Sequence, residues 1–251
     1  MATAKSSGGT ARHTFALLAL AWCGCGASVM QVDGGAAPDG PDASVAVDAG
    51  AVDGGAADAG VRLPDPWADR VVSITPGDGA GFGQDRFPDV VLGPPQGGGE
   101  SSGSLDVLSL GRDGVIVLEF TDLVAVDGPG VDLLVFENPF GTFFETGVVA
   151  VSDDGVDWRE FACAADDVDA GFPGCAGAHV VFGNPAMGIS ATDPRVAGGD
   201  GFDLSLVGLS RARFMRIRDS GKNRFYGPPG GGFDLDAVAV VNARLVDGGA
   251  P

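Results

Sequence analysis

The side chains most able to do chemistry are two aspartates near the C-terminal end of the sequence. Asp234 and Asp236 stand in the phrase Gly-Phe-Asp-Leu-Asp-Ala-Val, which begins at Gly232. Alternate residues of a strand share a face, so both carboxylates would lie at the entrance of a strand that continues with Val238. Paired carboxylates repel each other, and a hard cation with about six to eight oxygen ligands satisfies them. We therefore expect a calcium site here or, as the alternative, two aspartates that cap turns by accepting backbone N–H groups.

A second polar group lies at Glu137 and Asn138, where an apolar run ends and Phe140 follows. An acid, an amide and an aromatic ring suit a calcium-assisted or sugar-stacking site, because oxygens orient hydroxyl groups and a ring covers the apolar side of a pyranose. Tyr226, in a glycine-rich loop, is a further candidate contact. We assign Glu137 to the metal site and Asn138 and Tyr226 to ligand binding. The alternative is a turn whose phenylalanines close the end of the core.

The sequence holds few of the groups that enzymes use. Its two histidines are His13 and His179, and it contains no nucleophile-elbow, zinc-protease, phosphate-loop or dinucleotide-binding motif. A glycoside hydrolase would need Glu137 to face a second carboxylate about 5 to 9.5 Å away. We expect a non-catalytic domain.

The net charge excludes one class of partner. Acidic residues outnumber basic ones 34 to 15, which gives a net charge of −19, and Lys5 and Lys222 are the lysines. Binding to nucleic acid or to an anionic membrane surface needs clustered positive charge. We therefore expect no nucleic-acid partner.

The N-terminal residues predict export. Residues 1–25 have basic residues, a short apolar run and then a cysteine, the layout of a secretory signal that ends at a bacterial lipoprotein processing site. Cys25, or alternatively Cys23, would carry the lipid; secretion without a lipid is the other alternative. Residues 26–61 are rich in Ala, Gly and Asp and have no basic residue, so we expect a flexible tether. Residues 247–251 would form a disordered tail.

The elements that must position the candidate residues are strands within residues 62–246. Short apolar runs alternate with Asp-Gly, Gly-Pro and Pro-Pro turns, and no helical pattern stands out, so we predict an all-β fold, a two-sheet jelly-roll β-sandwich. The predicted strands span residues 115–120, 131–136, 147–152, 156–161, 212–218 and 234–241. Asp154-Gly155 predicts a tight hairpin. The apolar run 237–241 predicts a central strand.

Cys163 and Cys175 are the cysteines of this domain. Two cysteines in the folded part of an exported protein favour a disulfide, which would close the loop of residues 164–174 between them. In the loop-entropy model it contributes about 3 kcal/mol to stability.

The final strand, Asp-Leu-Asp-Ala-Val, follows a strand that reads Ala-Arg-Phe-Met-Arg-Ile from Ala212. This succession of two segments resembles the last strands of the galactose-binding-like jelly roll of discoidin-type domains and carbohydrate-binding modules. In calcium-bearing members of that superfamily an acid at the start of the last strand is a metal ligand, and the resemblance implies that role for Asp236. Further phrases, such as Val-Phe-Glu-Asn-Pro-Phe from Val135, resemble bacterial cell-surface proteins of undetermined function. That resemblance covers residues 69–242 and implies export and a surface anchor.

We therefore expect an exported, lipid-anchored protein of the cell envelope that acts as a calcium-stabilised, non-catalytic module. Its partner would be a glycan or a surface protein, and it would meet the membrane through its N-terminal lipid. One alternative is a structural or adhesive surface domain with no small ligand. The other is a glycan-active hydrolase. The sequence does not indicate an oligomeric state.

Overall fold

The computed structural model of the protein describes residues 63–224 and 226–246. Strands predominate there, the helices are short 3-10 turns, and no helix is long and apolar enough to cross a membrane. The 3-10 turns are η1 (Gln84–Arg86), η2 (Asp89–Val91), η3 (Pro185–Met187) and η4 (Leu204–Val207). The fold is all-β. Outside the described residues lie the predicted signal 1–25, tether 26–61, tail 247–251 and both lipidation candidates, Cys23 and Cys25.

The largest sheet has five strands, and every neighbouring pair in it is antiparallel. In spatial order they are β1 (Arg70–Thr75), β3 (Val115–Glu119), β10 (Phe214–Asp219), β6 (Gly147–Ser152) and β7 (Arg159–Glu160). Burial alternates along the central strand β10: Met215 and Ile217 are buried, while Arg216 and Arg218 are partly exposed. This alternation gives the sheet one core-facing side and one solvent-facing side.

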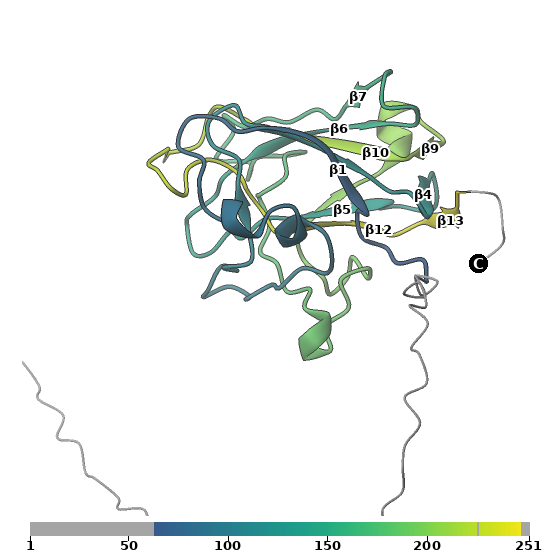
Figure 1. Ribbon diagram of the computed structural model, residues 1–251, viewed down its shortest axis with the longest axis horizontal. Coiled ribbons are helices and arrows are strands. Elements are labelled where there is room, and N and C mark those ends of the chain that lie inside the picture. The colour runs from purple at the N-terminus through teal and green to yellow at the C-terminus, as the bar shows by residue number, and fades with distance from the viewer. Residues whose placement is uncertain (1–62, 225, 247–251) are drawn as a thin grey trace, which may run out of the picture. The chain divides into compact units, whose positions relative to one another are not determined.

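Three smaller antiparallel sheets complete the fold. One contains β12 (Ala237–Val240), β5 (Leu133–Phe136) and β8 (Asp200–Phe202); the second contains β13 (Ala243–Leu245), β4 (Leu123–Val126) and β9 (Arg211–Ala212); the third pairs β11 (Asp234–Leu235) with β2 (Leu108–Ser109). Figure 1 shows β5 and β12 running below β6 and β10.

The main core joins these layers. Leu118, Val149 and Ile217 of the five-stranded sheet belong to the same buried cluster as Val135 of β5 and Val238 of β12, and all five are fully buried. A fully buried aliphatic side chain contributes roughly 1.5–3 kcal/mol. Apolar contact between facing sheets is therefore the main source of stability in this part of the chain.

All six predicted strand segments contain strands, but some boundaries differ. β6 and β7 form the predicted hairpin around Asp154-Gly155. Residues 153–158 connect them, so the connection is longer than the tight turn that the sequence predicted, although Gly155 does have a positive φ, of 75°. The reason is that the Asp154 carboxylate accepts the backbone N–H groups of Val156 and Asp157, both at 2.8 Å, which holds the chain in a wider loop.

The last long strand is also placed differently from the prediction. β12 is buried along its whole length, as its apolar run indicated. However, β5 is the middle strand of its sheet, and β12 lies on one side of β5. A single bridge between Trp67 and Ala239 covers the other edge of β12.

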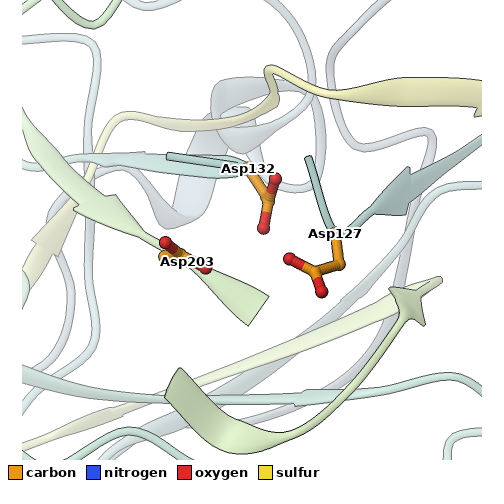
Figure 2. A group of neighbouring side chains, drawn as sticks. All are labelled: Asp127, Asp132 and Asp203. Atoms are coloured by element: carbon orange, nitrogen blue, oxygen red, sulfur yellow. The ribbon is translucent and has the colours of Figure 1, made fainter. Parts of the chain in front are cut away.

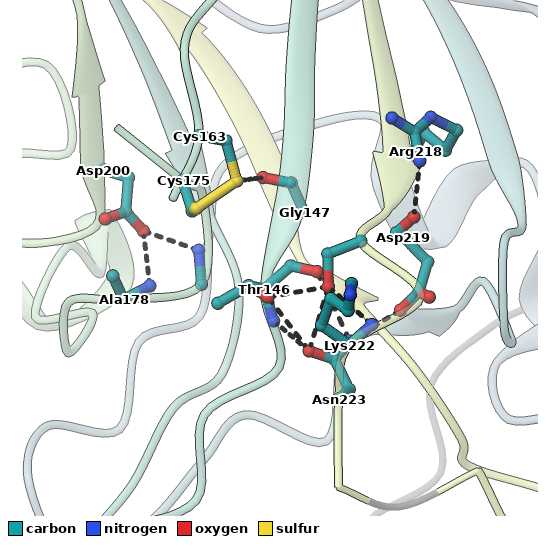
Figure 3. Close-up of a disulfide and its surroundings, with 12 residues drawn as sticks. Thr146, Gly147, Cys163, Cys175, Ala178, Asp200, Arg218, Asp219, Lys222 and Asn223 are labelled. Carbon is teal, nitrogen blue, oxygen red and sulfur yellow. Dashed lines mark hydrogen bonds between the residues drawn. A yellow bond between two sulfur atoms is a disulfide. The ribbon is translucent and has the colours of Figure 1, made fainter. Parts of the chain in front are cut away.

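The predicted disulfide joins Cys163 to Cys175, whose Cα atoms are 4.5 Å apart (Figure 3). It closes the loop of residues 164–174. Cys175 is buried, and the next residue, Ala176, forms a β-bridge with Gly147 at the start of β6. The disulfide therefore ties this loop to the five-stranded sheet.

We predict that Leu118→Ala lowers the free energy of unfolding by about 2–5 kcal/mol, because it empties a fully buried site between the sheets. Leu105→Ala is the matched control, since Leu105 is 78% exposed and its truncation should change stability by less than about 0.5 kcal/mol. Urea unfolding of the full chain measures both. Equal losses for the two variants would contradict the assignment of Leu118 to the core.

Candidate functional site

Three carboxylates from separate elements meet at one end of the core. Glu137 directly follows β5, Glu145 lies two residues before β6, and Asp234 is the first residue of β11. One carboxylate oxygen from each lies within 4.8 Å of the others. Glu137 and Glu145 are each 1% exposed, and Asp234 is partly buried. We call these three residues the carboxylate cluster.

The cluster has few hydrogen-bond donors. Among the described residues, no well-formed hydrogen bond reaches either carboxylate oxygen of Glu137, either oxygen of Glu145 or Oδ1 of Asp234, all of which are buried. The backbone of Asp234 and of Gly232 and the Ser109 side chain lie near these carboxylates and lower their pKa values slightly, but burial outweighs them. Within the same part of the chain no Lys, Arg or His forms an ion pair with any of the three. Burying a charged carboxylate that has neither a hydrogen-bond donor nor a cation beside it lowers the stability of the folded state by several kcal/mol.

The electrostatics follow from this environment. Burial raises the pKa of Glu137 well above 4.5, and the charges of Asp234 and Glu145 raise it further. Burial, with Asp234 and Asp219 nearby, raises the pKa of Glu145 to about 9. Burial also raises the pKa of Asp234 to about 6. The cluster must therefore either hold protons at neutral pH or bind a cation that supplies the missing positive charge.

The structure brings together two of the three predicted metal ligands and separates the third. Glu137 and Asp234 are in the carboxylate cluster, whereas Asp236 is not. The strand changes partner between the two aspartates: β11 pairs with β2 and β12 pairs with β5. Asp234 and Asp236 thus belong to strands of different sheets, and Asp236 lies outside the carboxylate cluster.

Asp236 has donors of its own. Its carboxylate accepts the backbone N–H of Gln96 at 3.0 and 3.3 Å. Burial raises the pKa of Asp236 to about 7, and the Gln96 and Ser104 hydrogen bonds partly oppose this rise. The amide of Asn138 donates to the Ser104 carbonyl at 2.8 Å. Asp236 and Asn138 thus hold the segment 96–104 against the core.

Tyr226 lies apart from Asn138 and is also held by hydrogen bonds. Its hydroxyl donates to Asp219 at 2.9 Å and accepts the backbone N–H of Asn223 at 3.0 Å. The Arg112 guanidinium lies 4.1 Å from the centre of its ring. The predicted ligand contacts Asn138 and Tyr226 therefore belong to different loops.

Glu145 is the cluster residue that sequence reasoning missed. It stands in the phrase Phe-Phe-Glu-Thr, just before β6, with no repeat or motif around it. The one feature of the sequence that could have drawn attention to Glu145 is that it is a glutamate, because glutamate is rare in this aspartate-rich chain. Its nearness to Glu137 depends on the pairing of distant strands, which local pattern does not encode.

In a second group of three acids, two have hydrogen-bond donors and the third, Asp127, is exposed. Asp127, Asp132 and Asp203 point toward a common space (Figure 2). Asp132 accepts from the backbone N–H groups of Gly128 and Leu204 and from the Asn242 amide. The Asp203 side chain caps η4 by accepting the Ser205 N–H at 2.9 Å. The phrase Gly-Phe-Asp-Leu occurs twice in the sequence, from Gly201 and from Gly232. Its aspartate caps a turn in the first copy, as Asp203, and joins the carboxylate cluster in the second, as Asp234.

His179 pairs with a buried acid. Its Nδ1 lies 2.7 Å from Asp200. Asp200 also accepts the backbone N–H groups of Gly177 and Ala178; Figure 3 shows Asp200 beside Ala178. The Asp200 hydrogen bond raises the pKa of His179. No described Ser, Thr or Cys side chain hydrogen bonds to His179, so the pair does not form a nucleophile-activating triad.

Comparison with protein-family models and with curated proteins found no match to this chain.

We predict that the ion-free protein loses stability as the pH rises. The folded pKa of Glu145 is about 9 against an ordinary value of 4.5, so between these values the folded state holds more protons than the unfolded state. The free energy of unfolding must then fall across that range. Glu145→Gln cannot ionise and should flatten the decline, while the exposed control Glu160→Gln should not. Urea unfolding in chelator, repeated across this pH range, measures the slope; the same slope in all three proteins would contradict the prediction.

Proposed function

We propose that the protein is an exported, lipid-anchored surface module that binds glycans without catalysis and is stabilised by calcium held at the carboxylate cluster. The observation that carries the proposal is the convergence of Glu137, Glu145 and Asp234, five of whose carboxylate oxygens are buried without a well-formed hydrogen bond within the described part of the chain. An ion there would neutralise charge that the fold otherwise leaves uncompensated.

The donor set favours calcium over other metals. All three side chains offer oxygen, and neither histidine nor cysteine belongs to the cluster. Hard cations prefer such oxygen ligands, whereas zinc and copper sites usually include nitrogen or sulfur. Calcium also accepts irregular geometry more readily than magnesium, which suits ligands that come from two loops and a short strand.

The arrangement of sheets supports the galactose-binding-like jelly roll within the all-β fold. All four antiparallel sheets contribute buried residues to one core, and the last two strands, β12 and β13, pair with the distant strands β5 and β4. This is the pattern expected of a jelly-roll sandwich.

The geometry around Glu137 supports a non-catalytic role over hydrolysis. Oxygens of Glu137 and Glu145 lie within 4.8 Å of each other, and both residues are 1% exposed. Retaining glycosidases place their carboxyl groups about 5–5.5 Å apart, inverting ones farther, and in both the substrate must enter between them. A sugar has no access to this pair.

Export and lipid anchoring rest on the sequence of residues 1–25, with Cys25, or Cys23, as the acceptor. The Cys163–Cys175 disulfide adds support, because stable disulfides are typical of proteins outside the cytosol. The alternative of a structural or adhesive domain with no small ligand shares this location.

We predict that calcium raises the unfolding midpoint of the full chain relative to chelator. Calcium at about 100 times its dissociation constant adds about 2.7 kcal/mol. For a domain of this size that corresponds to roughly 5 to 10 °C. Glu137→Gln should abolish the gain, because it removes one of the three carboxylates that would hold the ion.

Asp236→Asn is the matched control, since Asp236 lies outside the carboxylate cluster. It should keep the calcium gain. Loss of the gain in Asp236→Asn with retention in Glu137→Gln would move the ion to Asp236, as the family resemblance implied. No calcium gain in wild type would mean that the cluster is held by shared protons.

A further inference from the structure

A cavity of about 450 Å³ is lined by Phe144 and Thr146, the two neighbours of Glu145 in the sequence. Its apolar wall comes from the aromatic pair Phe144 and Phe172, whose ring centres are 5.8 Å apart, and from Val168. Lys222 and Arg224 also line the cavity. The volume is within the range of about 300–1,000 Å³ that is usual for small-molecule sites.

A second hollow of about 270 Å³ extends this cavity. It shares Thr142, Phe144 and Arg224 with the first and adds Phe143. Because the two hollows share these three residues, they are adjacent, and we treat them together as one groove. We call it the aromatic groove.

The charge of the groove is opposite to that of the chain. The protein carries a net charge of −19 with 15 basic residues, yet two of these line the groove. The Lys222 ammonium lies 3.3 Å from the exposed carboxylate of Asp166. Among the described residues no carboxylate pairs with Arg224. The charged side chains that line the groove therefore sum to one positive charge, and Arg224 can accept an anion without breaking an existing pair.

The groove is held in place before any ligand arrives. Asn223, on its floor, binds Thr146 through its side-chain oxygen at 2.6 Å and Asp219 through its amide at 2.6 Å (Figure 3). Phe172 lies in the loop closed by the disulfide and has a φ of 57°, a conformation that a bulky residue adopts rarely. A groove whose walls are fixed in advance loses less entropy when a ligand binds.

We propose that the aromatic groove binds an acidic sugar, a glycan segment that carries a carboxylate on its pyranose ring. The Arg224 guanidinium matches a carboxylate with two parallel hydrogen bonds. The faces of Phe144 and Phe172 cover the apolar side of the ring. This inference rests on the proposed glycan-binding function and specifies the class of ligand that the module takes.

The test is calorimetric titration of the full chain, in calcium, with trigalacturonic acid and with the neutral galactose trisaccharide. The acidic sugar should bind at least about tenfold more tightly, because the charged contact exists for it alone. Arg224→Gln should weaken its binding about tenfold, which corresponds to about 1.4 kcal/mol. Phe144→Ala should weaken both sugars. The control Arg195→Gln should change neither, because Arg195 is an exposed residue outside the groove that pairs with Asp193.

The outcomes separate this inference from the proposed function. Equal binding of the two sugars, or binding of the acidic sugar that Arg224→Gln leaves unchanged, would overturn the acidic-sugar assignment and leave the glycan-binding module standing. Binding of neither sugar would overturn both and favour the structural surface domain.

Discussion

A carboxylate taken out of water must find donors or a cation, because a buried charge without either costs several kcal/mol. Most buried aspartates of this fold meet that constraint with backbone N–H groups from loops. Asp219 accepts from the backbone of Asp113, Gly221 and Phe233, from the Tyr226 hydroxyl and from the Asn223 amide. Asp132 and Asp200 do the same for other segments. The aspartate-rich composition is thus used to fasten long loops to a small set of strands.

The carboxylate cluster is the exception to this pattern. Its three residues come from different sheets. Glu137 follows β5 of one sheet, Glu145 precedes β6 of the facing sheet, and Asp234 opens β11. An ion bound to all three would therefore join the two layers at one end of the core. Because Phe144 and Thr146 flank Glu145, the same ion would fix the wall of the aromatic groove. Stability and ligand binding would then depend on a single site.

Local pattern predicted much of this fold. Apolar runs predicted β3 and β6, and the even cysteine pair predicted the disulfide, because these features depend on neighbouring residues or on chemistry alone. The site was predicted only in part. Glu137 and Asp234 were identified from their place at strand ends, but Asp236 was grouped with them because the strand was taken as continuous. Glu145 was missed, since its approach depends on which distant strands pair.

The most direct measurement is a crystal structure of the protein grown in calcium. The account predicts one ion within about 2.3–2.6 Å of oxygens from Glu137, Glu145 and Asp234, the usual range for calcium. Direct oxygen-to-oxygen contacts between these carboxyl groups, at hydrogen-bond distance and with no ion between them, would show that they share protons instead. That result would contradict the central claim that a cation completes this fold.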